Sequence, residues 1–126
     1  SLNLKNTPDL AQTIAVTCLG MHVECKLRGL HTLKIKETDR LMALKVEIEK
    51  LGATVKITDA SLELVNSGKI KTDIAIDTYN DHRMAMAFAP LGLKVPITIN
   101  NVGVVSKSYP SFWDDLKRID FDQKIF

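Results

Sequence analysis

The chain has 126 residues, of which 45% are hydrophobic and 25% are charged. These values are typical of a globular domain, so the composition excludes a disordered chain and a small disulfide scaffold. The 17 basic residues barely outnumber the 15 acidic ones, which argues against a dedicated nucleic-acid binder. No apolar stretch approaches the ~20 residues that a bilayer requires, so we expect no membrane span.

The two cysteines and the amino terminus indicate the compartment. Cys18 and Cys25 lack a CxxC spacing, so we expect buried free thiols rather than a disulfide or a metal pair. No basic segment followed by an apolar run opens the chain, which makes the cytoplasm the expected location. Because the chain begins at Ser1 without a methionine, we expect it to be part of a longer protein.

The first half of the chain predicts helices over 7–20 and from about 38 to 52. Thr7-Pro8-Asp9 is typical of a helix start. The second helix has an apolar stripe and ends at Gly52, which favours the left-handed C-terminal position. Between and after the helices we expect a strand and turn over 22–29, a hairpin of 54–58 with 62–65, and a strand at 74–76.

The second half repeats this order, with a helix over 81–91, a strand over 96–100 and a helix over 110–119. Asp9 and Asp81 are separated by 72 residues, as are Gly20 and Gly92. We therefore expect two related units, roughly 7–77 and 78–126, the second without its closing strands. The alternative is that two matched copies arise by coincidence in any α+β chain.

Short charged clusters occur at the predicted turns and helix starts. Helix N-termini carry a partial positive charge and favour anions. Arg40, Arg83 and Lys107 at or near such starts would add to this charge and form a positive rim that an anionic ligand could neutralise. Two arginine forks and a lysine suit a small ligand with a carboxylate and a phosphate, such as phosphoenolpyruvate. The candidates for proton transfer are Asp9, Glu37 and His82.

Each of these residues also has an ordinary structural interpretation. Asp9 and Asp81 fit helix-cap acids, Arg83 a surface ion-pair member, His82 a capping or pairing residue, and Lys107 an exposed side chain. No glycine-rich phosphate loop, zinc spacing or nucleophile elbow is present in the sequence. The residues alone therefore leave catalysis, anion binding and a purely structural role open.

Four strings change this balance because they resemble, in order and spacing, the 5-enolpyruvylshikimate-3-phosphate (EPSP) synthase family. They begin at Pro8 (PDLAQT), Lys36 (KETDR, followed by LGA at Leu51), Asp81 (DHRMAM) and Ser106 (SKSYP). KETDR and DHRMAM are specific together, since the sibling transferase that acts on UDP-N-acetylglucosamine lacks both in this form. The resemblance covers essentially the whole chain.

The resemblance implies a transferase that moves the enolpyruvyl group of phosphoenolpyruvate to the 5-hydroxyl of shikimate 3-phosphate, without metal or cofactor. It implies that Asp9 accepts the hydroxyl proton, that Glu37 exchanges protons with the methylene carbon, and that His82 tunes Glu37. Its substrate-binding residues would be Lys36 for the shikimate hydroxyls, Arg40 and Arg83 for the carboxylate, and Lys107 for the phosphate. Glyphosate would compete at this site.

The resemblance also implies a fold and a partner segment. The family is two-domain, and each domain is an inside-out α/β barrel of repeated helix-strand-helix-strand-strand units. Residues 1–126 would be one piece, the C-terminal part of one such domain, lacking the N-terminal part that holds most of shikimate 3-phosphate. Thr32 replaces an asparagine found in some members. We expect the chain alone to be inactive; the alternatives are an anion-binding module of the same fold or the UDP-N-acetylglucosamine transferase.

Overall fold

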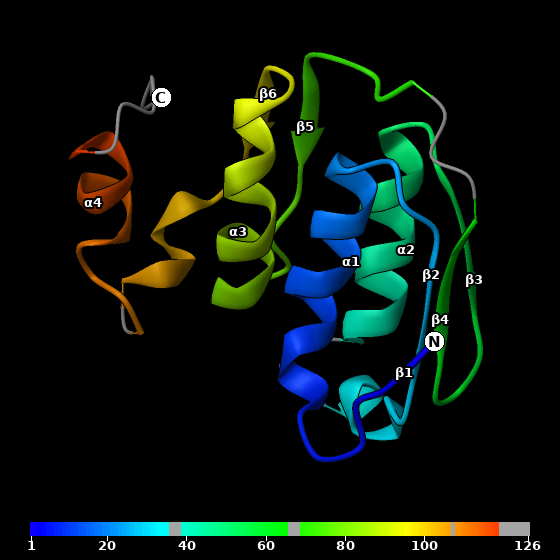
Figure 1. Ribbon diagram of the computed structural model, residues 1–126. Coiled ribbons are helices and arrows are strands. Elements are labelled where there is room, and N and C mark those ends of the chain that lie inside the picture. Colours follow the sequence, from blue (N-terminus) through cyan, green and yellow to red (C-terminus); the bar gives the residue numbers. More distant parts are fainter. Residues whose placement is uncertain (36–38, 66–68, 107, 119–126) are drawn as a thin grey trace.

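The computed structural model describes residues 1–35, 39–65, 69–106 and 108–118 (Figure 1). Helices and strands are interspersed along the chain, which confirms the expected α/β class. The elements are β1 (Leu2–Asn3), α1 (Ala11–Gly20), β2 (Cys25–Arg28), α2 (Arg40–Lys50), β3 (Thr54–Ile57), β4 (Leu62–Val65), β5 (Ile74–Ile76), α3 (His82–Phe88), β6 (Ile97–Ile99) and α4 (Phe112–Arg118).

A four-stranded sheet with the order β1-β2-β4-β3 forms one side of the molecule. The predicted hairpin is present as the antiparallel pair β3 and β4, and β2 pairs with β4 in the same sense. By contrast, β1 runs parallel to β2. Helices α1 and α2 lie side by side against this sheet (Figure 1).

The second half of the chain has a smaller sheet, in which β5 and β6 are parallel. Helix α3 connects these two strands and packs against α1, and α4 lies at the far end of the molecule (Figure 1). Both halves therefore contain a strand, a helix, a parallel strand and a second helix, in that order. The limits expected for the two units, 7–77 and 78–126, stay a prediction.

The predicted apolar stripe of α2 is fully buried. Leu41, Leu44, Ile48 and Leu51 have no exposed surface, and they share a core with residues of α1, α3 and the larger sheet. Gly52 follows the helix with φ at +103°, a region that residues with a Cβ rarely adopt. The amphipathic pattern and the terminal glycine thus determine how α2 packs and where it ends.

Three predicted helices are shorter in the structure than the sequence indicated. Residues Pro8–Leu10 form a 3-10 turn before α1, and Thr7 makes no side-chain cap. Helix α3 ends at Phe88, and Ala89–Leu93 continue as a 3-10 turn, because Pro90 has no N–H for the α-helical ladder. Helix α4 begins only at Phe112, not at residue 110.

One short strand and two 3-10 turns were not predicted from the sequence. Strand β1 and the 3-10 turns His31–Ile35 and Val102–Val105 are too short to give a periodic signal.

Cys18 and Cys25 are free, as expected, but half-buried rather than buried. Burial, and then the neighbouring Cys18, raise the pKa of the Cys25 thiol to about 11.

Tyr79, just before α3, gives a prediction for alkaline pH. Burial, followed by its hydrogen bond to the Glu47 carboxylate, raises the pKa of the Tyr79 phenol well above 10. The stabilisation is fully present below pH 10 and is lost as pH rises through the raised pKa, because only the unfolded chain releases the proton at pH 10. We expect urea denaturation to give a lower free energy of unfolding at pH 11 than at pH 9. In Tyr79→Phe the difference in free energy of unfolding between pH 9 and pH 11 should be smaller. An equal difference would show that Tyr79 is not the group responsible.

Candidate functional site

The starts of three helical segments meet at one cluster of charges. Arg40, the first residue of α2, has a side chain only 3% exposed. Its Nε donates to Oδ2 of Asp81 at 2.7 Å and its Nη2 to Oδ1 of Asp81 at 3.3 Å. Its Nη1 donates to Oδ1 of Asp9 at 3.1 Å. Arg40 thereby ties α2 to the residues that open α1 and α3.

Asp81 is the buried centre of this cluster. Its side chain has no exposed surface, and its Oδ1 also accepts the backbone N–H of Arg83 at 2.9 Å, which makes Asp81 the N-cap of α3. Gln12 on α1 donates its Nε2 to Oδ2 of Asp81 at 3.3 Å. A buried carboxylate is stable when it is paired and hydrogen-bonded in this way. The cap interpretation of Asp81 is confirmed, and the same carboxylate fixes Arg40.

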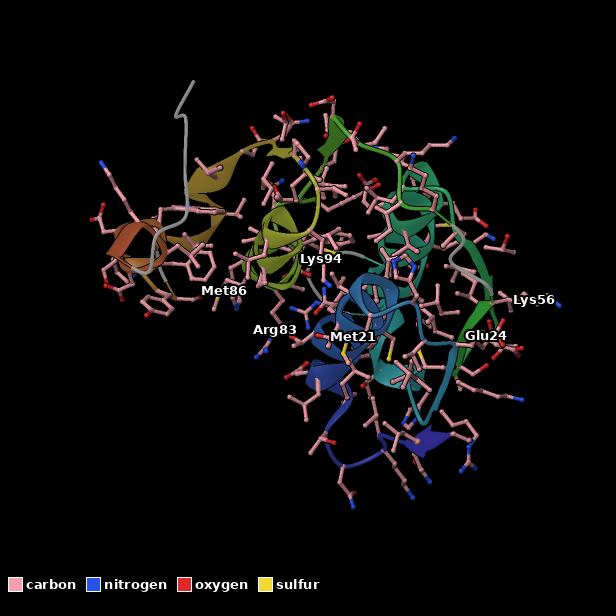
Figure 2. The ribbon with its side chains drawn as sticks, turned by 45° about the horizontal axis from the view of Figure 1, so that its top comes forward. Met21, Glu24, Lys56, Arg83, Met86 and Lys94 are labelled. Carbon is pink, nitrogen blue, oxygen red and sulfur yellow. The ribbon has the colours of Figure 1, made fainter. Side chains whose placement is uncertain are left out.

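Asp9 and Arg83 form the exposed side of the cluster. Nη2 of Arg83 lies 3.5 Å from Oδ2 of Asp9, and their side chains are 40% and 41% exposed. Figure 2 shows Arg83 pointing from α3 toward α1, whereas Met86 points toward α4. Asp9 therefore pairs with both arginines and remains accessible to a ligand. Asp81, by contrast, is not accessible to a ligand.

A cavity of about 250 Å³ opens beside this pair. It is smaller than the ~300 to 1,000 Å³ common for drug-sized ligands, so it suits a small molecule. It is lined by Asp9, Thr13, His82, Arg83, Met86, Ser108 and Tyr109. The cavity thus offers a carboxylate, an imidazole, a guanidinium and three hydroxyls to its occupant.

The structure brings together four of the seven predicted site residues. Asp9, Arg40 and Arg83 are linked by ion pairs, and His82 lines the same cavity as Asp9 and Arg83. The other three predicted residues, Lys36, Glu37 and Lys107, lie outside the described residues. The KETDR string is therefore represented in the structure by Asp39, the N-cap of α2, and by Arg40.

The expected positive rim is corrected by these contacts. The sequence placed Arg40 and Arg83 at helix starts as cations that need an anionic ligand, but Asp9 and Asp81 already balance them. The four side chains sum to no net charge. An anion that binds here therefore competes with Asp9 for Arg83 and gains less than it would from two unpaired arginines.

Sequence reasoning missed Gln12 as part of the site. Gln12 is 1% exposed, and among the described residues its Oε1 has no hydrogen-bond partner. The available signal was a glutamine among the apolar positions of the first helix, where an amide is expected to need a buried partner. Oγ1 of Thr32 is likewise buried without a partner among the described residues.

The described residues form neither a metal-binding cluster nor a membrane-spanning helix. Within ranges 1–35, 39–65, 69–106 and 108–118, no group of three or more His, Cys, Asp or Glu side chains is arranged to hold a metal ion. In the same part of the chain, no helix has the length and apolar character needed to cross a membrane.

Comparison with known proteins decides which family this site belongs to. The family model described as "EPSP synthase (3-phosphoshikimate 1-carboxyvinyltransferase)" matches residues 1–116. The chain belongs to the EPSP synthase family. The resemblance of the four sequence strings is therefore confirmed, and the Asp9, Arg40, Asp81 and Arg83 cluster is part of an EPSP synthase fold.

Curated relatives named 3-phosphoshikimate 1-carboxyvinyltransferase agree with this assignment. The Bacteroides fragilis protein is 48% identical over 121 residues, which are 94% of this chain and 30% of the relative. The chloroplastic Arabidopsis thaliana protein is 40% identical over 119 residues, again 94% of this chain but 23% of the relative. The chain thus spans less than a third of the length of these EPSP synthases.

The solved structures agree as well. An EPSP synthase from Acinetobacter baumannii superimposes with a TM-score of 0.72 at 26% identity, over 90% of this chain and 28% of that one. A second A. baumannii EPSP synthase structure gives a TM-score of 0.71 at 24% identity and supports the fold alone. The α/β arrangement around the cluster is therefore that of EPSP synthases.

Proposed function

We propose that this chain supplies the phosphoenolpyruvate-binding side of an EPSP synthase active site. The proposal is carried by one observation: in a chain of this family, Arg40 and Arg83 share Asp9 beside a small cavity that His82 also lines. The reaction would be transfer of the enolpyruvyl group to the 5-hydroxyl of shikimate 3-phosphate with release of phosphate. Glyphosate would compete for the same cavity.

Exposure assigns the roles among the charged groups. Arg83 is 40% exposed at the cavity and can meet the substrate carboxylate with its planar fork. Arg40 is 3% exposed and its Nη1 already donates to Asp9, so we expect it to contribute less directly than Arg83 to the carboxylate contact. Asp9, 41% exposed, is the carboxylate that can accept the proton of the attacking hydroxyl. Fixed cations of this kind stabilise a leaving phosphate without reorganising.

The proposed steps conserve atoms and charge. The 5-hydroxyl oxygen bonds to C2 of phosphoenolpyruvate while Asp9 takes its proton and Glu37 gives a proton to the methylene carbon. In the second step Glu37 takes a proton back from that carbon and the bond from C2 to the phosphate oxygen breaks. Phosphate leaves with the assistance of Lys107 and takes up the proton that Asp9 had accepted, so that it departs as hydrogen phosphate and both carboxylates are restored. His82 tunes Glu37, and Lys36 contacts the shikimate hydroxyls. These assignments rest on the family strings in which the residues occur.

We further propose that residues 1–126 are the C-terminal portion of one domain of an inside-out α/β barrel. The recurrence of strand, helix, parallel strand and helix in both halves supports this architecture. Because the chain spans about 30% of the B. fragilis relative, shikimate 3-phosphate would be held mainly by the remainder of such a protein. The chain alone should therefore bind phosphoenolpyruvate but release no phosphate from it.

A chimaera tests the proposed function directly. The matching segment of the B. fragilis EPSP synthase is replaced by this chain, and phosphate release is measured with both substrates, with the parent protein as the positive control. The proposal predicts release that requires both phosphoenolpyruvate and shikimate 3-phosphate and that glyphosate inhibits. A folded chimaera that releases no phosphate, while its parent does, contradicts the proposal.

In this chimaera, Glu37→Gln should separate binding from chemistry. The amide keeps the size of the side chain but cannot exchange protons, so kcat should fall by about 10² to 10⁴ while KM for both substrates stays within about twofold. Steady-state phosphate release measures both parameters. The control is Glu63→Gln on β4, which removes the same charge away from the cavity and should leave kcat unchanged. Unchanged kcat in Glu37→Gln would show that Glu37 has no such role.

A further inference from the structure

A second buried carboxylate lies on α2, seven residues after Arg40. Glu47 has no exposed side-chain surface, and positions seven apart occupy nearly the same face of a helix. Its Oε1 accepts hydrogen bonds from Nζ of Lys50 at 2.6 Å and from the backbone N–H of Asp77 at 2.9 Å. Its Oε2 accepts the hydroxyl of Tyr79 at 2.6 Å. Two of these three donors belong to the segment just before α3.

That segment, residues 77–80, has an unfavourable backbone conformation. Tyr79 and Asn80 have φ of 56° and 55°, a left-handed region that side chains with a Cβ rarely occupy. Such a pair persists where the surrounding structure holds it. The segment also has side-chain contacts to Lys50 and Asn100, including the Thr78 hydroxyl to the Asn100 carbonyl at 3.1 Å. In addition, the Thr78 carbonyl accepts the backbone N–H of Asp81 at 2.8 Å, and Tyr79 packs against the core. Glu47 and Lys50 both link α2 to this segment, and among the described contacts Glu47 is the one that accepts the hydroxyl of Tyr79 in the strained turn.

Helix α2 therefore contacts the segment that leads into α3 at two points. At its first residue Arg40 binds Asp81, the N-cap of α3, and two turns later Glu47 binds Tyr79. The residues that follow Asp81 are His82 and Arg83, which line the cavity. The direction in which α3 presents these side chains depends on the turn at 79–80.

We propose that Glu47, acting through the Tyr79 hydroxyl, is a positioning residue that sets His82 and Arg83 at the phosphoenolpyruvate cavity. This inference rests on the proposed function, because orienting Arg83 affects ligand binding only if Arg83 contacts phosphoenolpyruvate. A tyrosine phenol is protonated at physiological pH, and the raised pKa of Tyr79 extends its ability to donate to more alkaline pH.

Glu49 on the same helix provides a matched control. Its Oε2 accepts Nζ of Lys45 at 3.3 Å and the backbone N–H of Val55 at 3.3 Å. Glu47 and Glu49 thus each receive one lysine and one backbone amide, but Glu49 holds β3 rather than the turn before α3. A substitution at Glu49 therefore shows how much phosphoenolpyruvate affinity changes when α2 loses a comparable contact that does not involve the turn.

The test compares Tyr79→Phe with the unaltered chain, both isotopically labelled for NMR. Phenylalanine removes one hydroxyl and leaves Oε2 of the buried Glu47 without its donor. In the ligand-free chain we expect the amide signals of His82 and Arg83 to shift or broaden. On titration with phosphoenolpyruvate we expect the dissociation constant to rise about tenfold. Glu49→Gln should leave both readouts unchanged within about twofold.

The possible outcomes separate the two proposals. If the unaltered chain binds and a folded Tyr79→Phe chain binds equally well with unmoved His82 and Arg83 signals, the positioning role is wrong. Equal weakening by Glu49→Gln would also overturn it. If the unaltered chain does not bind phosphoenolpyruvate, the proposed function fails, and the ligand-free signals still decide whether Tyr79 orients these residues. Should Tyr79→Phe not fold, Glu47→Gln, which keeps one acceptor oxygen, is expected to give the same shifts.

Discussion

Replacing Asp81 by alanine should lower the free energy of unfolding by about 3 to 5 kcal/mol, because it strands a buried arginine. Arg40 is 3% exposed and would lose two of its described hydrogen bonds, keeping the one to Asp9. The N-cap of α3 disappears at the same time. Since a domain has only about 5 to 15 kcal/mol of stability, this loss is a large fraction of the total, and urea denaturation followed by circular dichroism would measure it.

Asp81→Asn is the matched control for this prediction. Asparagine keeps the size of the side chain and one oxygen that can accept the Arg83 amide, but it removes the charge that Arg40 requires. Its loss of stability should be smaller than that of Asp81→Ala. A loss below about 1 kcal/mol in Asp81→Ala would show that the buried pair does not hold the three helix starts together.

Arg83→Ala should leave the fold intact and weaken phosphoenolpyruvate binding by about ten- to hundredfold. The side chain is 40% exposed, and the pair that it forms with Asp9 is long, at 3.5 Å, so removing it costs little stability. A carboxylate that loses a charge-assisted contact loses about 1.5 to 3 kcal/mol, which corresponds to this change in affinity. Isothermal titration calorimetry of the chain with phosphoenolpyruvate would measure it.

Two further variants show whether the effect is specific to Arg83. Arg83→Lys keeps the charge without the planar fork and should give an intermediate affinity. Arg28→Ala on β2 removes the same charge from an exposed side chain whose described bond is to Ser1, so it should leave affinity unchanged. If Arg28→Ala weakened binding as much as Arg83→Ala, a diffuse charge effect rather than a contact would explain the result.

Local patterns in the sequence predicted most of the secondary structure. The apolar stripe of α2, its terminal Gly52 and the hairpin of β3 and β4 appear as expected, because each depends on residues a few positions apart. The limit of α3 differs because Pro90 has no N–H with which to continue the α-helical ladder. The 3-10 turn at Pro8–Leu10 before α1 has no such explanation, since proline is compatible with the first turn of an α-helix. These differences move element boundaries but not the order of elements.

The sequence predicted part of the membership of the candidate site but not how its residues pair. Residue types and family strings indicated Asp9, Arg40, His82 and Arg83, and the structure brings these four together. Their pairing could not be predicted, because the bonds from Arg40 to Asp81 and from Gln12 to Asp81 join residues 41 and 69 positions apart. That long-range pairing turns the expected positive rim into a balanced cluster.

The most direct test of the central claim is an NMR titration of the isotopically labelled chain with phosphoenolpyruvate. The backbone amides of Asp9, Arg40, His82 and Arg83 should shift together and saturate with one dissociation constant. Glyphosate should then displace the ligand and move the same signals. If these four amides do not move at millimolar phosphoenolpyruvate, or if the shifts spread over the surface lysines without saturating, the cluster is not the phosphoenolpyruvate side of the active site.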